Sequence, residues 1–165
     1  MSSGHKNLSD FDSNAILPSA ADMSFGVVIA EWNSEITEAL YRGAFDTLIK
    51  LGASPEKILK KHVPGSYELP LGAQFFLENG KVDAVICLGC VIQGNTRHFD
   101  FICDAVSEGI MNLNLKYNKP VIFGVLTTDT IQQAYDRSGG KHGNKGDEAA
   151  VTAAKMVDLK RSFKL

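Results

Sequence analysis

The chain has few cysteines, a single tryptophan and no long apolar run, and these shortages exclude whole classes of protein. Three cysteines in 165 residues cannot form the disulfide framework of a small stapled domain. No apolar run approaches the roughly 18–20 residues that a membrane span needs. The net charge is −2 and the basic residues are scattered, so neither nucleic acid nor an anionic membrane is favoured as a partner. The N-terminus lacks the apolar core of a signal peptide, so we expect a cytoplasmic protein.

The remaining composition is that of one soluble domain. A length of 165 residues with 44% hydrophobic and 22% charged residues suits a single domain with a substantial core. Residues 1–22 are rich in Ser, Asp and Asn and show no hydrophobic periodicity. We therefore predict a flexible N-terminal arm over 1–22 and one folded domain over 23–165.

Within that domain, short apolar runs alternate with segments of helical periodicity. The predicted strands are the four apolar runs 25–30, 57–63, 82–92 and 120–127. The predicted helices are the segment from Asn33 or Ser34 to Gly52, then 66–77, 97–117, a short helix after Asp129, and 144–159. Near-continuous apolar strands that alternate with helices predict a parallel sheet covered on both faces. Right-handed crossovers then give a three-layer α/β sandwich.

The most informative segment runs from Gly89 to Asp100, where an apolar strand ends at a glycine turn and a helix begins. Asn95 and Thr96 lie where the first N–H groups of that helix have no intrahelical partner, which favours a bound phosphate. His98 falls in the first helical turn beside this position, and an imidazole exchanges protons near neutral pH. The segment predicts an enzyme that acts on a small phosphorylated molecule.

Other unusual residues follow the predicted strands, and ligands bind at the carboxyl ends of strands in such sheets. Trp32 directly follows the first strand, and it is either a core anchor or a stacking surface for a planar ring. Glu68 follows a Pro-Gly turn, and it either favours the helix dipole or contacts a ligand. Lys145 opposes the dipole of its helix, so stability alone does not explain it. Arg137 ends its short helix where a cation is favoured, and it becomes functional if it meets a phosphate held by another chain.

Cys87 and Cys90 match the C-x-x-C spacing of redox and zinc motifs. The predicted strand, however, directs their side chains to opposite faces of the sheet. We therefore interpret both cysteines as small buried side chains.

Five motifs occur in one order between about residues 25 and 160. They are Trp32-Asn33 with Ile36-Thr37, Val63-Pro64-Gly65-Ser66-Tyr67-Glu68-Leu69-Pro70, Gly89 to Phe99, Pro120 to Thr128, and Asn144-Lys145-Gly146 with Glu148-Ala149-Ala150. Together they resemble the lumazine synthases of riboflavin biosynthesis. The resemblance implies a transferase with a four-stranded, parallel, flavodoxin-like sheet.

The resemblance also implies a reaction. It is the condensation of 5-amino-6-(D-ribitylamino)uracil with 3,4-dihydroxy-2-butanone 4-phosphate to 6,7-dimethyl-8-ribityllumazine, with release of phosphate and water, as the penultimate step of riboflavin biosynthesis. Imine formation, phosphate elimination and ring closure require only proton transfers, so no organic cofactor and no metal is expected. Much of the rate is expected to come from holding the two substrates together.

Carried over from the family, the residue roles fall into three groups. The implied catalytic residue is His98, which would transfer protons. The implied pyrimidine-binding residues are Trp32, Ser66, Tyr67, Glu68, Cys90, Val91, Ile92, Phe123 and Lys145. The implied phosphate-binding residues are Asn95, Thr96 and Arg137, with Arg137 and Phe123 reaching in from an adjacent subunit. Two positions depart from the usual pattern, because Gln93 replaces a basic residue and Asn95 replaces Glu or Ala; we expect neither to change the assignment.

The family also implies an assembly, because its active sites lie between subunits of a pentamer. Some members stop at the pentamer and others close twelve pentamers into a hollow icosahedral shell. Segment 137–146 is short, as in the shell-forming members, so we predict a 60-mer, with riboflavin synthase as a candidate partner inside it.

Three rival functions stay open. A riboflavin synthase related to this fold would need no phosphate site, and the presence of Thr96 and Arg137 argues against it. A lumazine- or flavin-binding protein would keep Trp32 and Phe123 without needing His98. A purely structural shell protein would need none of these residues.

Overall fold

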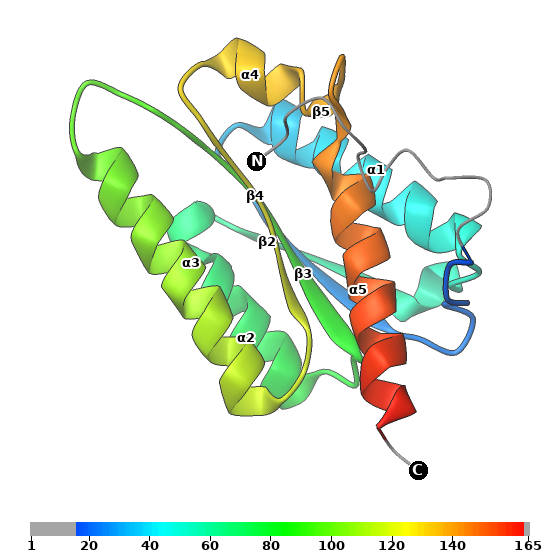
Figure 1. Ribbon diagram of the computed structural model, residues 1–165. Helices are drawn as coiled ribbons and strands as arrows, with labels where there is room; N and C mark the ends of the chain where they lie inside the picture. Colours follow the sequence, from blue (N-terminus) through cyan, green and yellow to red (C-terminus); the bar gives the residue numbers. More distant parts are fainter. Residues whose placement is uncertain (1–15, 164–165) are drawn as a thin grey trace.

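The computed structural model describes residues 16–163, and its centre is a four-stranded parallel sheet (Figure 1). The strand order is β2-β1-β3-β4, with β1 at Phe25–Ala30, β2 at Ile58–Val63, β3 at Ala84–Ile92 and β4 at Val121–Thr128. All six residues of β1 are buried, as a strand covered on both faces requires. The predicted strands and their parallel arrangement are confirmed.

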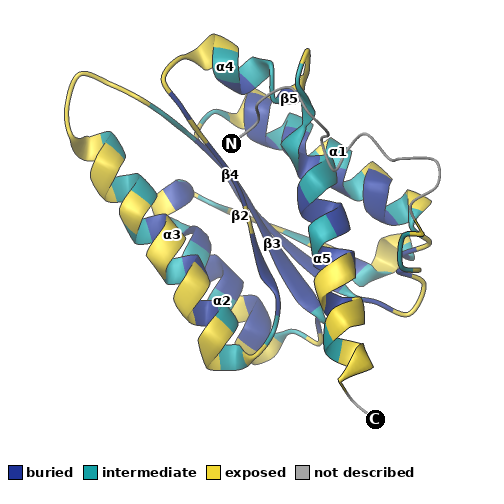
Figure 2. Ribbon diagram, viewed as in Figure 1, coloured by how far each residue is buried: buried dark blue, intermediate teal, exposed yellow. Residues whose placement is uncertain are grey.

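Helices cover both faces of this sheet. The helices are α1 (Ser34–Lys50), α2 (Leu69–Asn79), α3 (His98–Tyr117), α4 (Ile131–Tyr135) and α5 (Lys145–Ser162), with single 3-10 turns at Pro55–Lys57 and Ser66–Glu68. Figure 1 shows α1 and α5 on one face and α2 and α3 on the other. Two separate clusters of buried side chains fill the interfaces, and Figure 2 shows the strands buried between helices whose outer faces are exposed. The predicted three-layer α/β sandwich is confirmed.

The segment between α4 and α5 forms a small hairpin that the sequence did not predict. Its strands are β5 (Ser138–Gly140) and β6 (Gly143–Asn144), which pair antiparallel. Gly139 and Gly143 have φ values of 119° and 73°, which residues other than glycine rarely adopt. Strands this short carry no apolar alternation, so hydrophobic pattern could not reveal them.

The start of α5 is docked closely on α1. Asn144 caps α5 by accepting a hydrogen bond from the Gly146 N–H at 2.8 Å, and its amide donates to the Ala39 carbonyl at 2.9 Å. A Cβ on Gly146 would lie 1.9 Å from the Leu40 carbonyl oxygen, so only glycine fits there. This contact fixes the position of the hairpin and of Lys145 relative to the sheet.

The predicted N-terminal arm is described only from residue 16, and residues 1–15 lie outside the described chain. Ala20 is buried, and its N–H donates to the Leu51 carbonyl at 2.8 Å. Among the helices of the described residues, none is long and apolar enough to cross a membrane.

Candidate active site

The polar residues singled out by the sequence gather at the carboxyl edge of the sheet. Parallel strands place their carboxyl ends together, and the loops after β3 and β4 both lie at the top of the molecule in Figure 1. On the neighbouring strands, the Glu31 N–H donates to the Val63 carbonyl at 2.9 Å and the Trp32 N–H donates to the Pro64 carbonyl at 3.2 Å. The loops after β1 and β2 are therefore joined into one wall.

A cavity of about 760 Å³ opens at this edge, and we call it the edge pocket. Its lining residues are Trp32, Asn33, Gly65, Ser66, Tyr67, Glu68, Cys90, Val91, Ile92, His98, Phe101 and Ile102. The volume suits a small-molecule ligand. The edge pocket brings together His98 and seven of the nine residues expected to bind the pyrimidine. Trp32 is 74% exposed, so within this chain it is not a core anchor, and its ring face is available for stacking.

The turn after β2 holds Glu68 and Ser66 in the edge pocket. The Glu68 carboxylate accepts a hydrogen bond from the Gly65 N–H at 3.0 Å, which fixes its direction. The Ser66 hydroxyl is buried and has no hydrogen-bond partner among the described residues. A buried hydroxyl without a partner is costly, so Ser66 is suited to bond a ligand in the cavity it lines.

Gly89 explains how Ser66 packs so closely against β3. A Cβ at this position would lie 2.6 Å from the Ser66 hydroxyl oxygen and 2.8 Å from Leu69. Gly89, which lies within β3, is therefore part of the floor beneath Ser66.

The two cysteines of the C-x-x-C motif lie on opposite faces of β3, as predicted. Cys87 belongs to the core beside α2 and α3, and Cys90 to the core beside α1 and α5. Burial raises the pKa of the Cys87 thiol to about 12 and that of Cys90 to about 11. Both thiols therefore stay protonated at neutral pH, which makes them poor nucleophiles and poor metal ligands.

The predicted phosphate segment forms an exposed loop between β3 and α3. The Gln93 N–H donates to the Thr128 carbonyl at 2.8 Å and anchors the start of the loop beside β4. Asn95 and Thr96 are exposed, and the Thr96 hydroxyl accepts a hydrogen bond from the His98 N–H at 3.4 Å. His98 is the first residue of α3 and lines the edge pocket, so it lies where this loop meets the pocket.

Phe123, Arg137 and Lys145 line a different cavity. We call it the β4 groove; it measures about 890 Å³ and lies along the edge strand β4 between α3 and α5. Phe123 is 41% exposed on this strand. The structure therefore does not bring these three predicted residues to the edge pocket of the same chain.

Hydrogen bonds and an ion pair hold the charged residues of the β4 groove. The Arg137 guanidinium donates to the Gln133 carbonyl at 3.0 Å, and the Lys145 N–H donates to the Arg137 carbonyl at 2.9 Å. The Lys145 ammonium pairs with Glu148 at 2.6 Å, which offsets the unfavourable helix dipole. Thr128 lies in the same groove with a buried hydroxyl that has no hydrogen-bond partner among the described residues. The groove thus offers cations and a hydroxyl donor to an anionic ligand.

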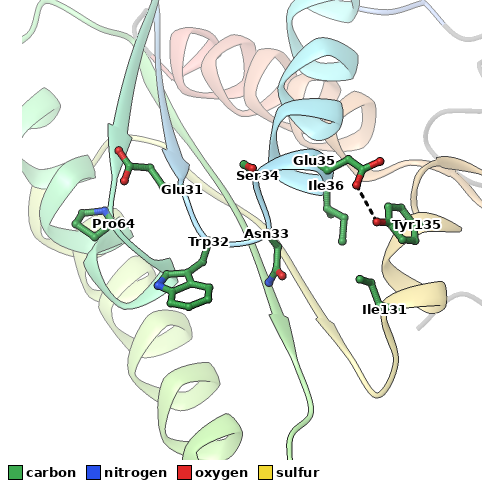
Figure 3. A pocket seen from close by; sticks show the side chains of 9 residues that line it. All are labelled: Glu31, Trp32, Asn33, Ser34, Glu35, Ile36, Pro64, Ile131 and Tyr135. Carbon is green, nitrogen blue, oxygen red and sulfur yellow. Dashed lines mark hydrogen bonds between the residues drawn. The ribbon is translucent and has the colours of Figure 1, made fainter.

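A third cavity, of about 610 Å³, adjoins the edge pocket and shares Trp32 and Asn33 with it (Figure 3). Across it, the Tyr135 hydroxyl donates to the Glu35 carboxylate at 2.9 Å and links α4 to α1. This hydrogen bond raises the pKa of Tyr135. The tyrosine is therefore a neutral donor at physiological pH.

Sequence reasoning gave no binding role to four residues that line the edge pocket, namely Asn33, Gly65, Phe101 and Ile102. Phe101 and Ile102 follow His98 on the first turns of α3, and helical spacing could have placed them on its face. Asn33 was predicted as a helix start and as part of the Trp32-Asn33 motif, but without a role of its own in the site. Its left-handed backbone, with φ of 58°, has no sequence signature beyond the tolerance of asparagine for that conformation.

Comparison with known proteins gives a consistent result. A family model described as 6,7-dimethyl-8-ribityllumazine synthase matches residues 22–161. A protein of that name from Cytophaga hutchinsonii is 62% identical over 157 residues, which cover 95% of this chain and 98% of the relative. Another from Parabacteroides distasonis is 56% identical over 96% of this chain and 99% of its own length. A third from Flavobacterium johnsoniae is 52% identical over 98% of this chain and 84% of its own length.

Proposed function

The chain belongs to the 6,7-dimethyl-8-ribityllumazine synthase family, and from that premise we propose how its residues perform the reaction. The protein is a lumazine synthase, a transferase of riboflavin biosynthesis that joins a ribityl-bearing diaminopyrimidine to a four-carbon ketone phosphate. We propose that each active site combines the edge pocket of one subunit with the β4 groove of its neighbour. A cytoplasmic location follows from this metabolic role and is part of the proposal.

One observation carries this proposal: the residues that the family's chemistry needs lie in two separate cavities of the single chain. The edge pocket holds Trp32 and His98 but not Arg137, and the β4 groove holds Arg137 and Phe123 but not His98. Neither cavity alone combines the proton-transfer residue His98 with the cation Arg137. A head-to-tail contact that sets the groove of one copy against the pocket of the next completes the site, and such contacts close into rings.

The pyrimidine is proposed to bind in the edge pocket. Its ring stacks on Trp32, with Phe123 of the neighbouring subunit supplying a second aromatic surface. The Ser66 hydroxyl and the fixed Glu68 carboxylate bind polar groups of the ring edge and the ribityl chain, together with Tyr67. The remaining assigned contacts are backbone groups of Cys90, Val91 and Ile92, and the side chain of the neighbour's Lys145.

The butanone phosphate is proposed to bind at the loop before α3. Asn95 and Thr96 offer backbone N–H groups near the positive end of the helix, and the neighbour's Arg137 adds a full positive charge. These contacts place the ketone carbon beside the amines of the pyrimidine. Holding the two substrates in this way removes the entropic cost of bringing them together during the reaction. This is expected to account for a large part of the rate.

His98 is proposed to move protons during the steps that follow. The 5-amino group attacks the ketone carbonyl, and loss of water leaves an imine. Removal of a carbon-bound proton then expels phosphate, and the ribitylamino nitrogen closes the ring with loss of a second water. Each step needs a proton donor or acceptor near neutral pH, and His98 lies where the phosphate loop meets the edge pocket.

The proposed assembly is a pentamer closed into a 60-mer shell that can enclose riboflavin synthase as a partner. The short hairpin connection between α4 and α5 supports the shell, because it contains no inserted segment that would block contacts between pentamers. We also keep the proposal that residues 1–22 form an arm, which in the assembly is able to join the sheet edge of a neighbour.

A direct assay tests the function. Purified protein is mixed with both substrates, and lumazine fluorescence and phosphate release are followed together. We expect equal amounts of the two products and no reaction when either substrate is omitted. A protein that instead converts lumazine to riboflavin, or that binds lumazine without forming it, would contradict the proposal.

A further inference from the structure

We propose that Asn33 is a positioning residue that sets the distance between the two walls of the edge pocket, an inference that rests on the proposed function. Asn33 has φ of 58° and ψ of 43°, in the left-handed region, although residues at a helix N-cap usually have extended backbone. Among the described residues other than glycine, only Asn118 shares a positive φ. This conformation reverses the chain between β1 and α1, where the Trp32 indole and the Asn33 amide lie next to each other (Figure 3).

The backbone of this turn is held on one side by β2. Glu31 and Trp32 donate their N–H groups to the carbonyls of Val63 and Pro64. On its other side, β1 pairs with β3 only as far as Ile29 and Leu88. The pairing of β1 with β3 therefore ends before Trp32, so the turn is not held to β3 by strand pairing.

The side chain of Asn33 spans this gap. Its amide nitrogen donates to the Cys90 carbonyl at 3.0 Å, and its own backbone carbonyl accepts from the N–H groups of Ile36 and Thr37 at 2.9 and 3.0 Å. The Cys90 carbonyl belongs to the part of β3 that is proposed to contact the ring through its backbone, and Trp32 lines the same pocket from the turn after β1. Asn33 thus joins the turn that carries Trp32 to the β3 backbone that lines the same pocket.

The Asn33–Cys90 hydrogen bond should matter for binding of the pyrimidine ring in particular. A planar ring needs both walls at a fixed separation, whereas the phosphate loop after β3 does not contact Asn33 in the described hydrogen bonds. Loss of the Asn33–Cys90 bond should free the Trp32 turn while leaving the rest of the fold in place. The binding of the pyrimidine should then weaken more than the binding of the butanone phosphate.

The test uses Asn33→Gly, which keeps the left-handed backbone and removes the donor, and Asn33→Asp, which keeps the side-chain size but points an acceptor at the Cys90 carbonyl. The matched control is Asn118→Gly, the same change at the other left-handed asparagine, which ends α3. Trp32 is the only tryptophan, so time-resolved fluorescence anisotropy reports on its motion alone. The Michaelis constants for both substrates and the thermal midpoint are measured on the same samples.

For Asn33→Gly we expect faster local motion of Trp32 and a KM for the pyrimidine raised about three- to tenfold, the worth of one hydrogen bond. The KM for the butanone phosphate should stay within about twofold. Asn33→Asp should raise the pyrimidine KM further, and Asn118→Gly should change neither KM. Unchanged Trp32 motion with an unchanged pyrimidine KM would overturn the inference, and so would an equal rise in both constants with a lowered thermal midpoint. If the wild-type protein forms no lumazine, the proposed function fails, while the anisotropy comparison still decides whether Asn33 holds Trp32.

Discussion

In the proposed mechanism, His98 and Arg137 carry the two chemical tasks that a backbone alone cannot perform. His98 lines the edge pocket at the first turn of α3, and Arg137 lines the β4 groove, where the Gln133 carbonyl holds its guanidinium. The first residue can exchange protons, whereas the second stays protonated and can only bind an anion through its charge and its N–H groups. Their substitution should therefore give different kinetic results.

His98→Ala should lower kcat by about ten- to a thousandfold, the lower range of general acid–base contributions, because proximity supplies much of the rate. The KM values should change less. Steady-state kinetics give both numbers, and His62→Ala is the control, since His62 lies on β2 and pairs with Glu38 at 2.7 Å, away from the edge pocket. A kcat within about twofold of wild type would remove His98 from the mechanism.

Arg137→Ala should weaken ground-state binding of the butanone phosphate by about ten- to a hundredfold, the worth of a charge-assisted hydrogen bond. The affinity for the pyrimidine should hardly change. Calorimetry with each substrate separately measures the two affinities, and Arg42→Ala on the exposed face of α1 is the matched control. Equal losses for both substrates would instead assign Arg137 a structural role.

At the scale of elements, the docking of α5 on α1 positions the hairpin and with it the β4 groove. Gly146→Ala should lower the free energy of unfolding by about 1–3 kcal/mol, because the added methyl would lie 1.9 Å from the Leu40 carbonyl oxygen. Gly94→Ala is the control for stability, since a Cβ there meets no atom within 4 Å. Urea denaturation at one fixed protein concentration measures both. Equal stability of the two variants would show that α5 can shift without cost.

The elements with a clear hydrophobic pattern were the predictable part of this fold. The strand at 25–30 was predicted with the bounds it has, because an apolar run of that length between polar residues marks a buried strand. The hairpin between α4 and α5 could not be predicted. It depends on two glycines with positive φ and on the bond from Asn144 to Ala39, 105 residues away in the chain.

The candidate site was also predictable where it depends on the pattern of strands in the sequence, and not where it depends on contacts made only in the folded chain. Trp32 and Glu68 could be placed together because both follow strands of one parallel sheet, whose carboxyl ends share an edge. The separation of Phe123 from them could not be deduced from residue pattern, because it depends on β4 being the edge strand. The role of Asn33 depends on a backbone conformation that only the folded chain displays.

At the scale of the whole molecule, the proposed division of the site between two subunits implies an assembly. We expect a closed 60-mer; sixty subunits of 17.9 kDa give about 1,070 kDa, and five give about 90 kDa. Static light scattering on the purified protein separates these masses. A single species near the smaller mass in every buffer and pH would rule out the shell, and a fully active monomer would rule out the shared site as well.

The shared site also predicts complementation between two impaired variants. In a ring that mixes His98→Ala and Arg137→Ala subunits, some interfaces join an intact edge pocket to an intact β4 groove. With random mixing about a quarter of the interfaces are of this kind, because each partner is intact in half of the cases. The variant subunits are co-expressed with different affinity tags, and only mixed assemblies are purified.

Lumazine formation by these mixed assemblies is the most direct measurement of the central claim. The account predicts recovery of about a quarter of the wild-type rate, well above that of either variant alone, because complete sites form between chains. A rate no higher than the average of the two parent variants would contradict it, since it would mean that His98 and Arg137 act within the same chain.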